Sequence, residues 1–134
     1  VVRADRYPAS KQMLSGAEYM SGNHIVVTHL EGRDPTDSML ADTGLSRRVG
    51  LRCLHYFSAC RIVASTDMML TMPRAYAQEL SQILPIRVIE LPVNVPPIQV
   101  FMYWPASHDE DLAHSWLREQ VQVLAKKHRW LPHT

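Results

Sequence analysis

The sequence lacks the features that would assign it to a membrane, an export route or a nucleic acid. No apolar run approaches the ~18 residues that a membrane-spanning helix needs. Near the start, Arg3, Asp5 and Arg6 would interrupt the apolar core of a signal peptide, so no export signal is predicted. The 14 Lys and Arg residues are nearly balanced by 13 Asp and Glu residues, giving a formal net charge of +1. Because this balance provides no basic surface, we expect the chain by itself to bind neither a membrane nor DNA or RNA.

Residues that build phosphate, metal and nucleophile sites are also sparse. The five glycines are scattered singly, which argues against a glycine-rich phosphate loop. No His-x-x-x-His or Cys-x-x-Cys spacing occurs, and His24 and His29 would point to opposite faces of a strand. Cys53 and Cys60 are predicted to be reduced thiols, which suits the cytoplasm, although a disulfide stays open. Cys60 falls in the apolar part of a short helix, a poor setting for a nucleophile. We therefore expect no metal ion, no cofactor and no catalytic residue.

The sequence does contain the alternation that is typical of an α/β protein. With 134 residues, 46% of them apolar, the chain can form one domain or two very small lobes. Short apolar runs alternate with segments of helical period, without a repeat or a linker between them. This order predicts right-handed crossovers and a mostly parallel sheet flanked by helices. The predicted strands are 23–30, 49–54, 68–72, 86–91 and 98–104, and the predicted helices are 34–43, 55–65, 73–84 and one that follows residue 107.

Capping signals mark the ends of two of these helices. Asp34 is suited to an N-cap, Pro35 to the first helical position, and Gly44 to a left-handed residue after the helix. Ser107 and Glu110 have the spacing of a capping box for the last helix. That helix carries a stripe of apolar residues at helical spacing. The stripe consists of Leu112, Ala113, Trp116, Leu117, Val121 and Leu124.

Residues 63–73 read Val-Ala-Ser-Thr-Asp-Met-Met-Leu-Thr-Met-Pro and lead into a predicted helix. This run resembles the pattern Val-Ala-x-Thr-Asp-Leu-Ile-x-Thr-Leu-Pro of the effector-binding domain of LysR-type transcriptional regulators. Within the wider segment 47–80, Leu54 departs from the family, which usually has a proline before the residue equivalent to His55. Further similarities lie in Tyr7-Pro8, where the family usually has His-Pro, in the strand ending at Tyr103-Trp104, and in Trp116-Leu117-Arg118 of the last helix. Gly44-Leu45, Arg47-Arg48-Val49 and His55 resemble the aromatic-effector and nodulation-regulator branch.

The resemblance implies a fold, a division of the chain and a set of partners. The fold is that of type 2 periplasmic binding proteins, with about 8–97 as the second subdomain and about 98–134 as the strand and helix that return to the first. The implied function is to bind a small effector, aromatic or carboxylate, in a cleft between the lobes of a cytoplasmic regulator. The regulator would be a dimer or tetramer and would bind DNA through an N-terminal winged helix-turn-helix that this chain does not contain. In the family, a helix and strand equivalent to 34–43 and 49–54 form the self-association surface, with Met39 and Leu40 as apolar anchors here. The alternative is that both side chains pack internally.

Candidate effector-binding residues lie at predicted strand ends and on the returning strand. Ligands of open α/β sheets bind beyond the carboxyl ends of strands, which places Thr28, His29 and Thr71 beside the cleft. The resemblance adds His55, Tyr56, Phe101 and Tyr103. The alternatives are that Thr71 only caps the next helix, that His29 and His55 are ordinary loop residues, and that the two aromatic residues belong to the core.

Two other functions fit parts of the sequence. A small α/β enzyme fragment could use His55 with a carboxylate such as Asp67, although no nucleophile motif supports it. A fragment of a periplasmic solute-binding protein would share the fold. We also expect that the 134 residues cannot bury their own apolar surface, because the last helix and the strand 98–104 would complete a subdomain that is largely missing.

Overall fold

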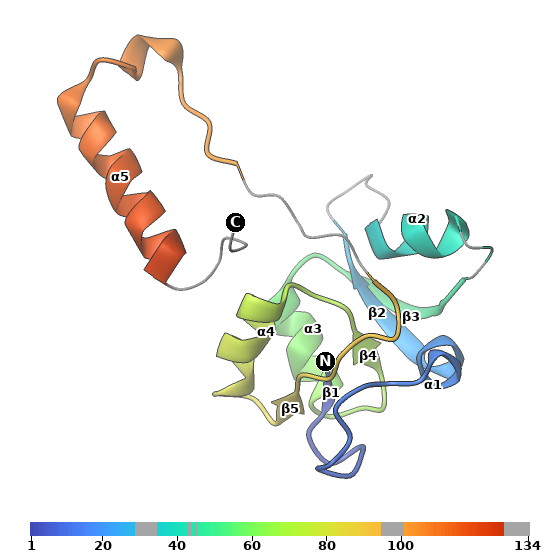
Figure 1. The fold of residues 1–134 in the computed structure, drawn as a ribbon. Helices are drawn as coiled ribbons and strands as arrows, with labels where there is room; N and C mark the ends of the chain where they lie inside the picture. The colour runs from blue at the N-terminus through green and yellow to red at the C-terminus, as the bar shows by residue number, and fades with distance from the viewer. Residues whose placement is uncertain (29–34, 43, 45, 95–100, 128–134) are drawn as a thin grey trace. The chain divides into compact units, whose positions relative to one another are not determined.

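The computed structural model describes residues 1–28, 35–42, 44, 46–94 and 101–127 of the chain (Figure 1). The chain divides into two compact units, Val1–Pro96 and Pro97–Thr134. The first unit contains β1 (Val2–Arg3), α1 (Gly16–Ser21), β2 (Asn23–Val27), α2 (Pro35–Asp42), β3 (Arg48–Cys53), α3 (Tyr56–Val63), β4 (Met69–Leu70), α4 (Arg74–Ser81) and β5 (Ile86–Arg87). The second unit contains a short 3-10 helix, η1 (Ala106–His108), and α5 (Leu112–Lys127).

A parallel sheet of three strands, in the order β3-β2-β4, organises the first unit. The central strand β2 pairs in parallel with both neighbours, so that Val27 lies opposite Cys53 and Ile25 opposite Leu70. The predicted parallel sheet is confirmed. Because all three strands run the same way, their carboxyl ends meet at one edge, from which the chain continues into α3 and α4.

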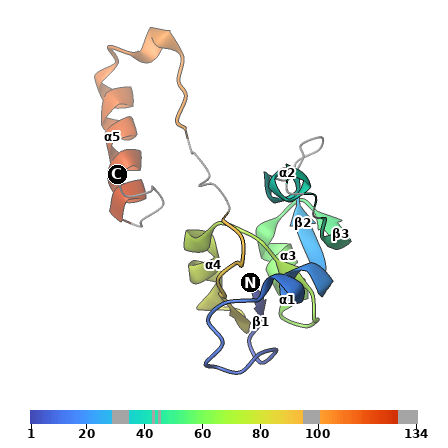
Figure 2. The same cartoon turned by 45° about the vertical axis from the view of Figure 1, so that its right-hand side comes forward.

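Helices pack on both faces of this sheet. Adjacent residues of β4 point to opposite faces, so Leu70 joins one core cluster and Met69 the other. The first cluster includes buried residues of α3 and α4, and the second includes Tyr19 of α1 and Leu40 of α2. Figures 1 and 2 show α4 beside α3, and α2 beside β2 and β3. The arrangement is the layered α/β architecture that the alternation of elements predicts.

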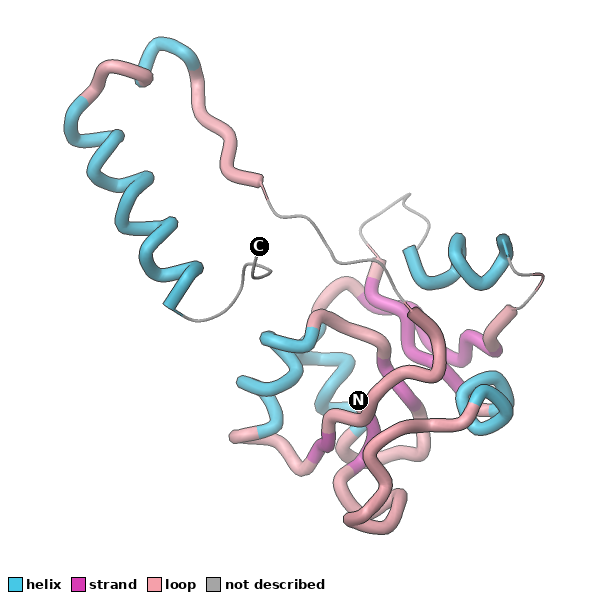
Figure 3. Tube along the Cα trace, viewed as in Figure 1, coloured by secondary structure: helices cyan, strands magenta, loops and turns pink. Residues whose placement is uncertain are grey.

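Segment 86–91 forms less strand than its alternating pattern predicts. Only Ile86–Arg87 is paired, antiparallel to β1. Residues 88–94 continue as loop (Figure 3), in which Glu90 forms an isolated parallel bridge with Met13. The bridge is short because the partner segment turns at Ser15 into α1. This loop matters for the site because it lies along the start of α4.

Both cysteines are free thiols, as predicted. Cys60 is completely buried in the first core cluster, and its Sγ lies 3.6 Å from Sδ of Met72. Burial raises the pKa of the Cys60 thiol to about 11. The thiolate is therefore scarce at neutral pH, which agrees with the prediction that Cys60 is no nucleophile.

The sequence reasoning missed helix α1. A capping box starts this helix: Ser15 Oγ accepts from the Glu18 N–H at 3.2 Å, and Glu18 Oε2 accepts from the Ser15 N–H at 2.7 Å. The Lys11 ammonium donates to both Glu18 oxygens at 2.9 and 3.0 Å. These contacts, led by that of Lys11, lower the pKa of the Glu18 carboxyl to about 2. The capping box was readable in the sequence, but a helix of six residues has too few turns to show a period.

We predict that the α1 capping box keeps its charge to about pH 2. Because the pKa of Glu18 is lowered, its contribution to stability is complete above the ordinary pKa of 4.5 and is lost as the pH falls through about 2. Replacing Lys11 with methionine should raise the Glu18 pKa by about one unit or more, measured by carbon NMR titration of the side chain. Lys127→Met, in α5, is the control and should leave that pKa unchanged. A wild-type midpoint near 4.5 would contradict the prediction.

The described part of the predicted strand 98–104 is not a strand. Residues 101–104 form loop, and Tyr103 is 86% exposed, whereas residues 98–100 lie outside the described residues. A strand needs a neighbour for its N–H and C=O groups. Among the described residues, no strand pairs with 101–104. The segment therefore does not form a strand despite its strong strand propensity.

The predicted capping box at Ser107 and Glu110 is also wrong. Ser107 lies in η1, and the carboxylate of Asp111 caps α5 by accepting from the N–H groups of Ala113 and His114 at 2.9 and 3.1 Å. An aspartate directly before the first helical turn can reach two unpaired N–H groups, and its negative charge is favourable at that end. The helix therefore begins four residues later than a box from Ser107 would start it.

Candidate functional site

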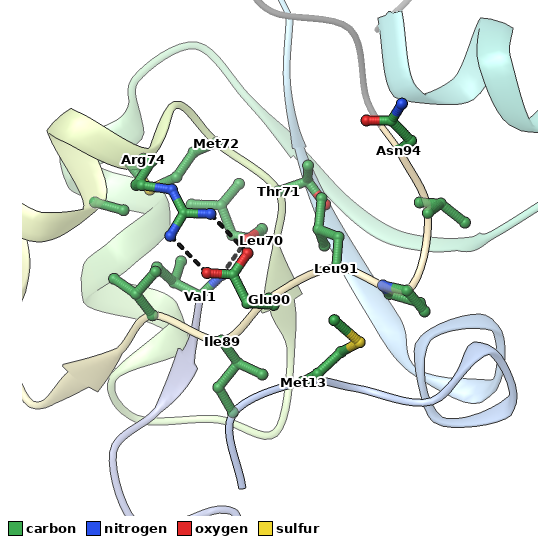
Figure 4. A pocket seen from close by; sticks show the side chains of 14 residues that line it. Val1, Met13, Leu70, Thr71, Met72, Arg74, Ile89, Glu90, Leu91 and Asn94 are labelled. Atoms are coloured by element: carbon green, nitrogen blue, oxygen red, sulfur yellow. Dashed lines mark hydrogen bonds and ion pairs between the residues drawn. The ribbon is translucent and has the colours of Figure 1, made fainter.

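A cavity of about 460 Å³ opens in the first unit where β4 leads into α4 (Figure 4). One wall is formed by the end of β4 and the start of α4, and the other by the loop 88–94. The location matches the rule that ligands of open α/β sheets bind beyond the carboxyl ends of strands. The lining residues are Val1, Met13, Leu70, Thr71, Met72, Arg74, Ala77, Val88, Ile89, Glu90, Leu91, Pro92, Val93 and Asn94.

Apolar side chains and polar groups line the cavity in nearly equal parts, and an ion pair lies at one side. Arg74 and Glu90 form a two-pronged contact, with N···O distances of 2.5 and 2.6 Å (Figure 4). The hydrogen bonds raise the pKa of Arg74 and lower that of Glu90, so both groups are charged at neutral pH. Arg74 is the first residue of α4, where a cation is unfavourable beside the positive end of the helix dipole. Glu90 offsets that cost, and an anionic ligand at this place would do the same.

Of the predicted site residues that the structure describes, Thr71 lines the cavity. It follows β4 directly, and its Oγ1 lies 2.9 Å from the Tyr19 hydroxyl. It does not cap α4, since the residue at the N-cap is Pro73 and no side chain caps that helix end. The alternative that Thr71 serves only as a cap is therefore wrong.

Three other predicted residues lie at the same sheet edge but do not line the cavity. Thr28 follows β2, is half-buried, and donates its N–H to the Cys53 carbonyl at 3.1 Å. His55 is exposed at the N-cap of α3, where its side chain makes no capping bond. Tyr56 packs edge-to-face on Tyr76 of α4, with ring centroids 5.9 Å apart. His29 lies outside the described residues.

The two aromatic residues predicted on the returning strand belong to the second unit. Phe101 and Tyr103 are both exposed, and their ring centroids lie 6.1 Å apart. Within their own unit they do not form a core, so the alternative that they pack inside it is not what the structure shows. Their role in effector binding stays a prediction.

Sequence reasoning missed the second wall of the cavity and its ion pair. The signal for Arg74 was its place directly after Pro73, at a helix start that disfavours a cation. Glu90 stands on a segment expected to be a strand, and nothing local connects it with a residue 16 positions earlier. In the described part of the chain, no three His, Cys, Asp or Glu side chains gather in a way that could hold a metal ion. No helix in that part is long and apolar enough to cross a membrane.

The acid–base pair of the enzyme alternative does not form. His55 precedes α3 and Asp67 follows it, so the eight residues of the helix, about 12 Å, separate them. Asp67 is instead paired with Arg3, whose Nη2 lies 3.2 Å from its Oδ1.

Comparison with known proteins gives a consistent picture. The family model of the LysR substrate-binding domain matches residues 2–125. Nodulation protein D 2 of Rhizobium tropici is 34% identical over 103 residues, which cover 75% of this chain and 33% of that protein. The HTH-type transcriptional activator NagR of a Ralstonia species is 26% identical over 114 residues, 84% of this chain and 38% of that protein. The chain thus spans 33% and 38% of the length of these two curated relatives.

Solved structures agree with these matches. The regulatory domain of MexT, a transcriptional activator in Pseudomonas aeruginosa, superposes with a TM-score of 0.69 and 25% identity, over 90% of this chain and 60% of that domain. A probable transcriptional regulator from the same organism superposes with a TM-score of 0.65 and 29% identity, over 72% of this chain and 32% of that one. Both similarities extend over most of the elements described above.

Proposed function

This chain belongs to the LysR substrate-binding domain family, and we propose that it senses a small molecule with the cavity between β4, α4 and the loop 88–94. The expected type 2 periplasmic-binding-protein-like α/β fold is confirmed by the solved regulatory domains. The single observation that carries the proposal is the cavity itself, which lies beyond the carboxyl end of a parallel strand and combines apolar walls with Thr71 and Arg74.

The lining supports an aromatic or carboxylate effector. About half of the wall is aliphatic or thioether surface, which suits a flat apolar body. Thr71 supplies a hydroxyl group for one polar end of the ligand, and Arg74 supplies the N–H groups that its pair with Glu90 leaves unused. We propose Thr28, His29, His55, Tyr56, Phe101 and Tyr103 as further effector-binding residues.

The DNA and the protein partners that we propose would be bound by a longer regulator that contains this domain. We propose that DNA is bound by an N-terminal winged helix-turn-helix outside this chain, in a cytoplasmic dimer or tetramer. α2 and β3, with the partly buried Met39, are the proposed self-association surface. Leu40 is 1% exposed in the second core cluster, so the expectation that it anchors an interface is wrong and it packs internally. The first unit would be the second subdomain, about 8–97, and α5 with the segment before it would be the elements that return to the first.

Binding rather than catalysis is the function that the arrangement supports. The matched relatives are named as nodulation proteins and a transcriptional activator, and the separation of His55 from Asp67 removes the specific enzyme alternative. A periplasmic solute-binding fragment would share the fold, and the coding sequence upstream distinguishes the two: a winged helix-turn-helix there identifies a regulator.

The proposal is tested by calorimetry of the chain with benzoate, cinnamate and 2-naphthoate. At least one acid should bind, and Val88→Trp should weaken that binding by about tenfold or more because the indole fills the cavity. Ile83→Trp is the matched control, since Ile83 is exposed and lies outside the cavity. His55→Ala should weaken the binding free energy of the acid by about 1–3 kcal/mol if the imidazole donates to the carboxylate. Equal binding by the Val88 and Ile83 variants would show that the ligand binds elsewhere.

A further inference from the structure

A continuous line of polar contacts leads from the cavity to α2. Thr71 Oγ1, on the cavity wall, lies 2.9 Å from the hydroxyl of Tyr19 on α1. The same hydroxyl accepts from Arg47 Nη1 at 3.4 Å. Arg47 Nε in turn donates to Oδ1 of Asp37, in the first turn of α2, at 2.6 Å. Four residues far apart in the sequence therefore form one relay, Thr71–Tyr19–Arg47–Asp37.

The relay passes through the interior of the first unit. Tyr19 is 1% exposed, and the Arg47 side chain is also 1% exposed, whereas Asp37 reaches the surface. His24 fixes the middle of the relay, because its ring packs edge-to-face on Tyr19 at 4.6 Å and its Nε2 lies 2.6 Å from the Tyr19 carbonyl oxygen. Hydrogen bonds in such a water-poor setting are stronger than at the surface, and they polarise one another.

The chemistry of the groups favours one direction of the protons along the relay. A guanidinium can only donate, so the Tyr19 oxygen is the acceptor of its contact with Arg47. Among the described residues, Thr71 Oγ1 is the other polar atom within hydrogen-bond distance of the Tyr19 hydroxyl, so we assign Tyr19 as the donor and Thr71 as the acceptor of this contact. The Thr71 hydroxyl, having accepted this bond, has its own proton left for a different acceptor. Thr71 lines the cavity, and a bound carboxylate or carbonyl oxygen is the acceptor that this proton would meet.

We propose that Thr71 is the hydrogen-bond donor that selects an acceptor oxygen on the ligand, and that the Thr71–Tyr19–Arg47–Asp37 relay couples occupation of the cavity to α2. The inference rests on the proposed function in taking the cavity as the ligand site. A ligand oxygen that accepts from Thr71 strengthens each bond in turn and holds Arg47 and Asp37 more firmly. α2 is thereby stabilised when the cavity is filled, through contacts that do not include the ligand.

The coupling is tested first without a ligand, by hydrogen exchange of the α2 amides 39–42 in the 134-residue chain. Tyr19→Phe removes only the central hydroxyl and should speed exchange of these amides at least about twofold relative to those of α3. Thr71→Val should act in the same direction in the wild-type chain and have no added effect in the Tyr19→Phe chain. Tyr76→Phe, which changes an exposed tyrosine outside the relay, is the matched control and should leave α2 unaffected.

Two results would overturn the relay. One is unchanged α2 exchange in both Tyr19→Phe and Thr71→Val. The other is equal acceleration of α2 and α3, which would mean general destabilisation rather than a connection between Thr71 and α2.

The second arm adds 2-naphthoate, with toluene as a probe that has no acceptor oxygen. Thr71→Val and Tyr19→Phe should each weaken 2-naphthoate binding by about threefold or more and leave toluene binding unchanged. Saturating 2-naphthoate should slow α2 exchange in the wild-type chain but not in Tyr19→Phe. If Thr71→Val weakened the binding of 2-naphthoate and of toluene equally, the donor role of Thr71 would be overturned. If the wild-type chain binds none of the aromatic acids, the proposed ligand class fails, and the ligand-free exchange experiment decides the relay alone.

Discussion

Replacement of Arg47 by leucine should lower the free energy of unfolding of the first unit by about 3 kcal/mol. The Arg47 side chain is 1% exposed and its Nε lies 2.6 Å from Asp37 Oδ1, so the guanidinium forms a buried ion pair. Removing one member of such a pair typically costs about 3–5 kcal/mol, because the remaining charge has no partner. We expect the lower end of this range, since Asp37 keeps 30% of its side-chain surface in water.

Arg74→Leu is the matched control for this prediction. Arg74 and Glu90 form a shorter, two-pronged pair, but their side chains are 60% and 44% exposed. Solvent-exposed pairs contribute about 0–1 kcal/mol, so burial rather than bond length should decide the difference. Urea unfolding followed through the NMR signals of Ile25 and Leu70 reports on the core of the first unit. Equal losses in the two variants would show that Arg47 contributes no more than a surface pair.

The elements that sequence reasoning located correctly are those with strong local signals. The β-branched run 23–27 forms the central strand, and α2 ends at Asp42, two residues before Gly44. Gly44 has φ +70°, the left-handed conformation expected after the end of this helix. Such signals act within a few residues, so they are visible without knowledge of the fold. The predicted N-cap at Asp34 lies outside the described residues.

Failures of prediction occur where a distant partner decides the structure. Residues 101–104 have strand propensity but, in the described chain, no strand beside them. The strand predicted at 86–91 shortens because only two of its residues find a partner in β1. Propensity states what a segment can form, and pairing across the sheet decides whether it does.

The same distinction explains the candidate site. Thr71 was identified by the rule that ligands bind beyond the carboxyl ends of parallel strands. Applying this rule requires only the order of strands and helices along the chain. Arg74 opposite Glu90, and Tyr19 between Thr71 and Arg47, depend on how loops and helices pack in three dimensions. Tyr19 in particular lies on α1, the helix that was not predicted, so the relay could not have been inferred from the sequence.

The apolar stripe on α5 leads to the other large effect that we expect. Within the described residues of its own unit the helix buries none of its side chains, and Trp116 is 61% exposed. The further exposed members of the predicted stripe are Leu112, Leu117, Val121 and Leu124. Full burial of side chains of this kind is worth about 1.5–3 kcal/mol each, and a contiguous apolar face of this length is rare on a soluble monomer. The match covers 60% of the regulatory domain of MexT, so 40% of that domain has no counterpart in this chain.

We therefore predict that the isolated 134-residue chain self-associates through α5 and that Trp116→Glu shifts it toward monomer. Size-exclusion chromatography with light scattering measures the mass, and the Trp116 variant should need about tenfold or more protein to reach the same dimer fraction. Gln122→Glu adds the same charge on the opposite side of the helix, so it should leave the mass unchanged. A wild-type monomer that binds no hydrophobic dye would contradict the prediction, because the stripe would then have to be covered within one chain. If Gln122→Glu dissociates the dimer as strongly as Trp116→Glu does, charge rather than apolar burial controls the association.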